Sequence, residues 1–488
     1  MNQCNNERTS SIKKNIYSEI YTREDQKRFP EGFLFGTASS AYQIEGGYNV
    51  DGKGESVYDY YTHKTPEKFH NGSNGDVACD SYHKWQEDVH ILKDLGVDFY
   101  RFSISWSRIL PTGYSNKINE EGVKYYENLI DGLLKNGIQP MITLYHWDLP
   151  MPIQELGGWT NIKTAEYFED YARIVFERFG NKVKYWITIN TALLGYADSE
   201  FPPYINQPGI SNYMCIYVTL LAHAKAFRLY HNEFKQYKGQ VGIVVDGRWY
   251  QPGSDSDKDV EATNRALEFE IGIWLHPLLS PKGDFPEIVK ERIAAISMAE
   301  GYRQSRLPKF STTDIDLLKG SVDFVGLNLY TSHLVEHVED EHFKGTSTIR
   351  DEGIRLYQDA SWKGSQSTWL KVHPEGARKV LNWVKETYNN PVVFITENGF
   401  SDDGEIEDNN RIEYLQGYLT NILKAIYEDK VDVKGYAVWS LMDNFEWASG
   451  YSEKFGIYQV DFNDPDRCRY PKKSSLWYKN VIKNKQLL

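Results

Sequence analysis

The sequence predicts an α/β fold, a single (β/α)8 TIM barrel with long loops after its strands. The chain has 488 residues, a length that one barrel with loop insertions reaches. Short apolar runs alternate with amphipathic helical patterns, which is typical of βα units and a parallel sheet. No Gly/Ser-rich or Pro-rich linker interrupts this alternation. We therefore expect one domain over residues 29–488, preceded by a polar N-terminal extension over residues 1–28.

Eight runs have the composition of buried parallel strands. In chain order they are Phe33–Gly36, Val97–Ser105, Gln139–His146, Val183–Asn190, Gln240–Trp249, Asp323–Leu329, Val392–Thr396 and Gly435–Ser440. Eight strands with intervening helices favour a closed barrel over an open sheet.

Helical patterns lie between these runs. In the first of them, apolar side chains at Val123, Tyr126 and Ile130 recur at the spacing of one helix face. The helices expected on this basis are Glu120–Asn136, Thr164–Phe179, Tyr213–Phe234, Pro374–Tyr388 and Arg411–Tyr427.

Charge and cysteine content exclude several classes of protein. The net charge is −13, which argues against binding to nucleic acid or to an anionic membrane surface. The four cysteines show no metal-ligand spacing and are too scattered for a disulfide framework; they are Cys4, Cys79, Cys215 and Cys468. We expect reduced thiols, no bound metal and no cofactor, whereas the oligomeric state cannot be predicted.

The N-terminal segment contains no apolar stretch of signal-peptide length, and no run approaches the roughly 18 apolar residues of a membrane span. We expect a cytoplasmic protein if Met1 is the native start. If a signal peptide has been removed, the protein is secreted, and Asn71 in Asn71-Gly72-Ser73 is then a glycosylation acceptor.

Polar residues gather at one end of the predicted strands. His146, Asn190, Asn328 and Glu397 lie at or near the ends of four runs, and Glu446 follows the last. Active sites of such barrels sit at the C-terminal ends of the strands, so these residues form the candidate site. A sugar-cleaving site built on two carboxylates uses one as nucleophile and one as general acid/base. Glu397 is a candidate for the first role.

Six motifs in order then point to a family. They are FLFGTASSAYQIEG from Phe33, YRFSISWSR, LYHWDLP, LNLYTS, ITENGF and WSLMDNFEW. From about Phe29 to near its C-terminus the chain resembles the retaining β-glucosidases of glycoside hydrolase family 1. The similarity is greatest to the insect branch of that family, which includes insect myrosinases (thioglucosidases).

The resemblance implies roles for particular residues. Glu397 matches the nucleophile, Arg101 the arginine that contacts it, and Tyr330 the tyrosine that hydrogen-bonds it; a cation at Arg101 would keep the carboxylate ionised. Trp439 matches the platform beneath the sugar ring. Residues that match or are expected to be sugar-binding positions are Gln43, His146, Asn190, Asn328, Glu446 and Trp447.

Glu446 implies an unphosphorylated sugar. In the family this position contacts the 4- and 6-hydroxyls of glucose, and a carboxylate there would repel a 6-phosphate. The phospho-glycosidases of the family carry a different residue.

The expected acid/base glutamate is missing. In the family the fourth strand ends in TFNEP, whereas here Asn190 is followed by Thr191 and Ala192. A threonine cannot protonate a leaving group at neutral pH. Losing general acid/base assistance costs about 10²–10⁴ in rate, or roughly 3–5 kcal/mol of barrier. Plant myrosinases of the family show an analogous change to Gln and use ascorbate as an external base, whereas aphid-type myrosinases keep the Glu.

Three interpretations of this loss remain open. The first is a thioglucosidase acting on glucosinolates, whose leaving group departs as a stabilised thiolate and needs no proton. The second is a β-glucosidase acting on O-glucosides with activated aglycones, with Asp198 or Glu200 as a replacement acid. The third is a sugar-binding pseudoenzyme, which would not need the activated nucleophile. In each case the ligand is a small-molecule glucoside.

Overall fold

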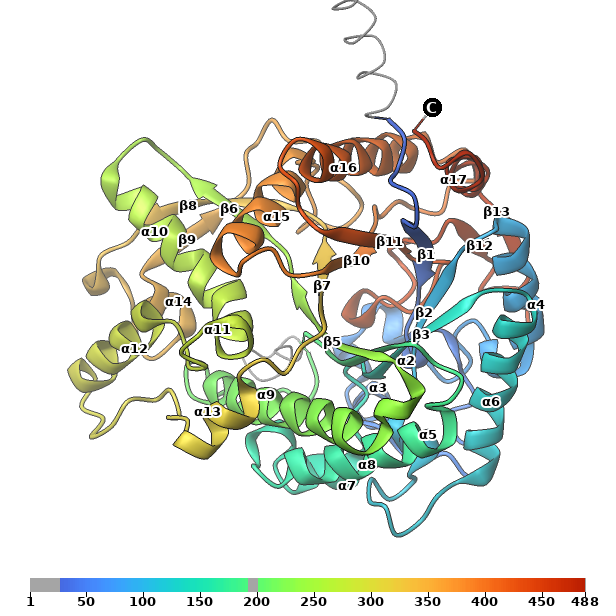
Figure 1. Cartoon of the computed structure of the whole chain (residues 1–488), viewed down its shortest axis with the longest axis horizontal. Helices are drawn as coiled ribbons and strands as arrows, with labels where there is room; N and C mark the ends of the chain where they lie inside the picture. Colours follow the sequence, from blue (N-terminus) through green and yellow to red (C-terminus); the bar gives the residue numbers. More distant parts are fainter. Residues whose placement is uncertain (1–26, 192–200, 488) are drawn as a thin grey trace, which may run out of the picture.

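The computed structural model describes residues 27–191 and 201–487. Eight parallel strands form a closed barrel (Figure 1) in the order β1-β11-β10-β7-β5-β4-β3-β2. The strands are β1 Leu34–Ala38, β2 Phe99–Ser103, β3 Gln139–Tyr145, β4 Tyr185–Asn190, β5 Gln240–Asp246, β7 Phe324–Leu329, β10 Val393–Asn398 and β11 Val433–Trp439. Each coincides with one of the eight predicted runs, so the predicted barrel is confirmed.

The predicted fifth run, Gln240–Trp249, was wrong at its end. The barrel strand β5 stops at Asp246, and Trp249 begins β6 (Trp249–Pro252), which pairs with β8 (Ser332–His337) in a separate sheet. Gly247 marks the exit, because an added Cβ there would lie 2.6 Å from the Leu329 side chain. The run extends too far because Trp249 and Tyr250, which begin β6, are also aromatic residues of the kind enriched in strands.

Two small sheets stand outside the barrel. One combines β6, β8 and β9 (Ile354–Tyr357), and it lies beside α10 at the left of Figure 1. The other pairs β12 (Tyr458–Val460) with β13 (Arg469–Pro471).

All five expected helices are present, with ends shifted by a few residues. They are α6 Glu120–Lys135, α8 Thr164–Phe179, α9 Ser211–Leu229, α15 Glu375–Thr387 and α16 Asn409–Tyr427. The one clear difference is at Tyr213–Phe234, where α9 ends at Leu229 and a π-helical turn, Tyr230–Phe234, continues it.

Further helices complete the outer layer and the loops. They are α2 Ala41–Ile44, α3 Val57–Lys64, α4 Ser81–Leu95, α5 Trp106–Ile109, α7 Met151–Glu155, α10 Asp257–Leu267, α11 Ile273–Leu279, α12 Glu287–Ala299, α13 Thr312–Leu318, α14 Thr348–Glu352 and α17 Lys473–Asn484. In the described ranges we find no helix with the length and apolar character of a membrane span.

A layer of aromatic rings fills the N-terminal end of the barrel. The ring of Phe394 packs against Phe324, Tyr185 and Phe99 at centroid distances of 5.2, 5.4 and 6.4 Å. These residues come from β2, β4, β7 and β10, of which only β7 and β10 are neighbours in the barrel. Gly242 makes room for the layer, because a Cβ there would lie 2.6 Å from the Phe324 ring. The layer closes this end of the barrel and leaves the C-terminal end for polar chemistry.

The described chain begins beside its own C-terminus. Arg28 forms an antiparallel bridge with Gln486, and the amide of Phe29 donates to the carbonyl of Lys485 at 2.8 Å. The predicted extension over residues 1–28 lies almost wholly outside the described residues, so the division at residue 28 stays a prediction.

Candidate active site

Glu397 lies near the end of β10 with both carboxylate oxygens held by hydrogen bonds. Arg101, fully buried on β2, donates from Nη1 to Oε1 at 2.6 Å. The Tyr330 hydroxyl, just beyond β7, donates to Oε2 at 2.7 Å. These contacts fix the carboxylate, which is only 5% exposed. The structure thus brings together the three residues expected to form the nucleophile and its supports.

Asn190 connects this group to the neighbouring strands. Its Oδ1 accepts from Arg101 Nη2 at 2.7 Å and from Asn328 Nδ2 at 3.0 Å. Its Nδ2 lies 3.3 Å from Nε2 of His146. Thr396 donates in turn to Asn328 Oδ1 at 2.8 Å. A continuous set of hydrogen bonds therefore spans the C-terminal ends of β2, β4, β7 and β10.

Burial controls the protonation of the site. It raises the pKa of Glu397 above its usual value, although the charge of Arg101 and the hydrogen bond from Tyr330 act in the opposite direction. The charge of Arg101 therefore opposes the effect of burial on the pKa of Glu397 but does not fully offset it. Burial and the Glu397 charge raise the pKa of Tyr330 well above its ordinary value, so its hydroxyl remains a donor. Burial, together with Arg101, lowers the pKa of His146, which is therefore neutral.

The predicted sugar-binding residues form the adjoining wall. Trp439 Nε1 donates to Glu446 Oε1 at 3.3 Å, and Gln43 Nε2 lies 3.4 Å from Glu446 Oε2. The His146 ring stacks near Trp439 and Trp447, at centroid distances of 5.7 and 6.0 Å. Burial raises the pKa of Glu446 well above its usual value, while the Trp439 hydrogen bond lowers it. Amide, carboxyl and indole groups in this arrangement suit the hydroxyls and apolar face of a sugar.

Thr191 lies immediately after β4, and within the described residues its amide and hydroxyl both contact a backbone carbonyl. Its amide donates to the Val244 carbonyl of β5 at 3.1 Å, and its hydroxyl donates to the same oxygen at 3.4 Å. The indole of Trp147 donates to the carbonyls of Asn190 and Thr191 at 3.0 and 2.6 Å. These bonds hold the chain at the end of β4. Asp198 and Glu200, the two expected replacement acids, lie outside the described residues.

Comparison with known proteins identifies the family. A family model described as glycosyl hydrolase family 1 matches residues 25–487. The chain belongs to glycosyl hydrolase family 1. It is therefore a glycosidase of the retaining β-glucosidase family, as the six motifs predicted.

Several relatives of this family 1 enzyme are similar over nearly their whole length. Myrosinase 1 of Brevicoryne brassicae is 46% identical over 461 residues, covering 93% of this chain and 98% of the relative. The human cytosolic beta-glucosidase is 42% identical over 468 residues, covering 94% and 99%. Among solved structures, aphid myrosinase matches with a TM-score of 0.91 and 45% identity, covering 94% of this chain and 100% of that one. The expected insect-type, myrosinase-like resemblance is thus confirmed, but β-glucosidases are nearly as similar.

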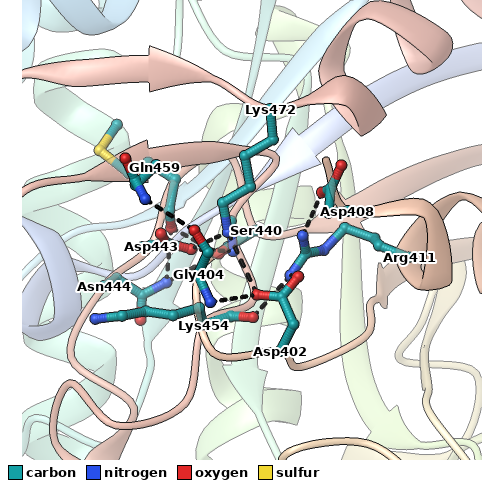
Figure 2. Close-up of polar contacts among 12 residues, drawn as sticks. Asp402, Gly404, Asp408, Arg411, Ser440, Asp443, Asn444, Lys454, Gln459 and Lys472 are labelled. Atoms are coloured by element: carbon teal, nitrogen blue, oxygen red, sulfur yellow. Dashed lines mark hydrogen bonds and ion pairs between the residues drawn. The ribbon is translucent and has the colours of Figure 1, made fainter. Parts of the chain in front are cut away.

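An ionic network that was not predicted from the sequence supports the Glu446 loop. Figure 2 shows it around Ser440, which directly follows β11; here Lys472, fully buried, donates to Asp443 Oδ1 at 2.9 Å. The amide of Gly456 donates to the same oxygen at 2.9 Å. Asn444 donates to Ser440 Oγ at 2.9 Å and also accepts from Gln43 at 2.9 Å. The network therefore joins the loop directly to a predicted sugar-binding residue.

A second part of this network lies around Arg411. Its guanidinium pairs with Asp408 and, at 2.7 Å, with Asp402 (Figure 2). The signal available in the sequence was the pair Asp443-Asn444 inside WSLMDNFEW, which has no assigned contact with the sugar. Charged residues so close to a buried strand need partners, and those partners come from distant segments.

A carboxylate on β5 was also missed. Asp246 ends that strand and lies beside Asn328 of β7 in the strand register. Arg248 Nη2 is 3.0 Å from Asp246 Oδ2. The sequence signal was an aspartate inside a run interpreted as continuous strand. Over residues 27–191 and 201–487 we find no group of three or more His, Cys, Asp or Glu side chains suited to a metal ion.

Proposed function

We propose that this enzyme is a thioglucosidase (myrosinase) that cleaves glucosinolates through a covalent glucosyl-enzyme without a general acid. The observation that carries the proposal is the contrast between Glu397 and Thr191. Glu397 has two hydrogen-bond donors of the kind that support a nucleophile, whereas Thr191 has no ionisable side chain and directs its hydroxyl to a backbone carbonyl. We interpret Thr191 as occupying the position of the family's acid/base residue.

The first half-reaction then needs no proton. The Glu397 carboxylate attacks the anomeric carbon, a glucosyl ester forms, and the bond from carbon to sulfur breaks. The thiohydroximate leaves with the bonding electrons as a stabilised thiolate. Arg101 and Tyr330 hold the carboxylate in position before the attack. An alkyl O-glucoside, whose leaving group is a strong base, would lose the 10²–10⁴-fold assistance that a general acid typically gives.

Binding of a sugar is supported by a buried ring nitrogen that lacks a hydrogen-bond partner. Within the described residues, Nδ1 of His146 is buried and has no hydrogen-bond partner. Such an atom costs free energy unless a ligand or water satisfies it. Its ring stacks near Trp439 and Trp447, and Trp439 in turn donates to Glu446. A glucose hydroxyl at this point would supply the missing partner.

The relatives support the thioglucosidase and leave one second candidate. Similarity to Myrosinase 1 of Brevicoryne brassicae, at 46% identity, favours a thioglucoside. Similarity to the human cytosolic beta-glucosidase, at 42%, favours a β-glucosidase acting on O-glucosides with activated aglycones. A sugar-binding pseudoenzyme is the weakest interpretation, because sugar binding alone does not require the two donors on Glu397.

A turnover panel on purified protein separates these candidates. A glucosinolate, an aryl glucoside with an acidic phenol and an alkyl glucoside are compared by kcat/KM. The proposal predicts turnover of the glucosinolate, and a preference of at least about 10² for both activated substrates over the alkyl glucoside. Turnover of the aryl glucoside alone would establish the second candidate. Glucose binding without turnover of any member would establish a pseudoenzyme.

A further inference from the structure

The further inference concerns Asp246, a carboxylate that faces the candidate site from the strand next to Thr191. In the strand register Asp246 of β5 pairs with Asn328 of β7, and Asn328 pairs with Glu397 of β10. The three residues therefore form one row at the C-terminal edge of three adjacent strands.

This row places Asp246 on the pocket side of the barrel. Residues paired in register on parallel strands point to the same face of the sheet. The side chain of Asn328 points into the barrel, since it contacts Asn190 and Thr396. Asp246 shares that direction. Adjacent strands are about 4.8 Å apart, so the backbones of Asp246 and Glu397 are separated by about 10 Å and their inward side chains converge.

Electrostatics agrees with this placement. Burial is the main cause of the raised pKa of Glu397, and the negative charge of Asp246 adds a smaller contribution in the same direction. Two carboxylates that interact across a sugar-binding pocket are the arrangement that retaining glycosidases use, with their carboxyl groups about 5–5.5 Å apart.

The surroundings of Asp246 suit a base rather than an acid. Arg248 Nη2 lies 3.0 Å from Oδ2, and the two side chains are 28% and 32% exposed. Burial alone would lower the pKa of Arg248, but the charges of Asp246 and its neighbours raise it, so the guanidinium stays positive. Within the described part of the chain, Oδ1 of Asp246 has no hydrogen-bond partner. A carboxylate held by a guanidinium can accept a hydrogen bond, and then a proton, from a water molecule.

We propose that Asp246 is the general base that activates water in hydrolysis of the glucosyl-enzyme. This inference rests on the proposed function, in that it takes Thr191 to leave the usual acid/base position without a carboxylate. The water oxygen forms a bond to the anomeric carbon while the ester bond to Glu397 breaks. Glu397 departs with the electron pair as a carboxylate, Asp246 takes the proton of the water, and it later releases that proton to solvent. Atoms and charge balance without a further reactant.

Asp246→Asn is the test variant, because it keeps the shape of the side chain and removes the base. The substrate is dinitrophenyl β-glucoside, whose leaving group needs no proton, so glucosyl-enzyme formation is measured even if no glucosinolate is cleaved. We expect the initial burst of phenolate to persist while steady-state turnover falls by about 10² or more, the usual contribution of a general base. Added azide should restore turnover and yield glucosyl azide.

Asp429→Asn is the matched control. Asp429 pairs with Arg378 at 2.6 Å with similar exposure, 21% and 29%, away from the candidate site. It should leave the burst, the turnover and the azide response unchanged. Asp246→Glu keeps the charge and provides a second variant if Asp246→Asn does not fold; it should retain steady-state turnover within about tenfold of the parent, in contrast to the loss of general base catalysis.

Three results would overturn the assignment. Turnover of Asp246→Asn equal to that of the parent would show that another group activates water. Loss of both the burst and the turnover would show that Asp246 maintains the shape of the site and does not activate water. A slow, azide-rescued phenotype in Asp198→Asn or Glu200→Gln, with Asp246→Asn unaffected, would assign the base to the loop after β4. If the parent protein cleaves no glucosinolate, the thioglucosidase proposal is wrong. The three results above can still be interpreted, because they are obtained with dinitrophenyl β-glucoside.

Discussion

The candidate site has two halves, and they differ in how firmly a carboxylate is held in each. On the half formed by β2, β7 and β10, Glu397 is buried and held at both oxygens by Arg101 and Tyr330. On the half formed by β4 and β5, Thr191 carries no ionisable group, and Asp246 is partly exposed beside Arg248. The difference teaches that attack on the anomeric carbon and proton transfer to the leaving group are separable. Under the proposed function, a site that retains the first function would serve substrates whose leaving groups need no proton.

The largest expected effect comes from a substitution of Glu397, in the half formed by β2, β7 and β10. Glu397→Gln keeps the shape of the side chain and removes the nucleophile, so turnover of every substrate should fall by more than about 10⁴, a barrier increase of more than roughly 5 kcal/mol. Sugar binding, measured by calorimetry with glucose, should survive. A fluorinated glucoside that traps the glucosyl-enzyme should label Glu397 in the parent. Activity within about tenfold of the parent would remove Glu397 from the nucleophile role.

The next largest effect is expected when a carboxyl group is added at residue 191, in the half formed by β4 and β5. Thr191→Glu supplies a carboxyl group at the end of β4, and kcat/KM for alkyl glucosides should rise by about 10². The added charge should also raise the pKa of Glu397 and repel an anionic glucosinolate, so the ratio of glucosinolate to alkyl glucoside turnover should fall. Thr191→Gln, of similar size but without the acid, is the control. Equal gains in both variants would show that proton transfer is not what residue 191 limits.

A smaller effect is expected at the sugar wall, which both halves share. Glu446→Ser removes the acceptor of the Trp439 hydrogen bond and a group expected to bind sugar hydroxyls, so kcat/KM for glucosides should fall by about 10- to 100-fold, or 1.5–3 kcal/mol. Discrimination against 6-phosphoglucosides should weaken, because the carboxyl group expected to face the 6-position of the sugar is lost. The measurement is the kcat/KM ratio for matched glucoside and 6-phosphoglucoside. A parent that already prefers the phosphorylated sugar would show the assignment of Glu446 to be wrong.

The smallest effect is a shift of the pH profile. The Tyr330 hydrogen bond lowers the pKa of Glu397, so Tyr330→Phe should raise that pKa. Because the ionised carboxylate is the nucleophile, activity should then be lost at a higher pH as the solution is acidified, with kcat/KM near neutral pH reduced by about tenfold, the worth of one hydrogen bond to a charged group. Tyr418 donates to the Tyr330 carbonyl at 2.7 Å, and Tyr418→Phe should leave the acidic limb in place. An unchanged limb in Tyr330→Phe would mean that its hydroxyl does not stabilise the charge.

The sequence predicts the barrel well because its signals are local. β7 and β10 are short apolar runs, and the polar residues Asn328 and Glu397 mark where they end. The exception at β5 has the same origin, since the strand-forming residues Trp249 and Tyr250 follow Gly247 closely but belong to a strand of another sheet. Local pattern gives the strands but not the point at which a chain leaves the barrel.

Contacts across the site are harder to predict. The bond between Arg101 and Asn190 joins residues 89 positions apart, and that between Asn190 and Asn328 spans 138 positions. The pair Lys472 and Asp443 is fully buried, although charged residues usually lie at the surface. Asp246 faces the pocket only because three strands lie in register. Such relations require the closed barrel, and the family resemblance supplied the roles that local pattern could not.

In the proposed mechanism the leaving group departs without a proton. The most direct measurement is the pre-steady-state rate of glucosyl-enzyme formation by the parent protein, across aryl and alkyl glucosides of graded leaving-group acidity and across pH. The account predicts a rate that falls steeply as the leaving group becomes more basic, and that stays constant with pH once Glu397 is ionised. A weak dependence on the leaving group, with a bell-shaped pH profile and strong activity on alkyl glucosides, would contradict it, because that result requires a proton donor in the site.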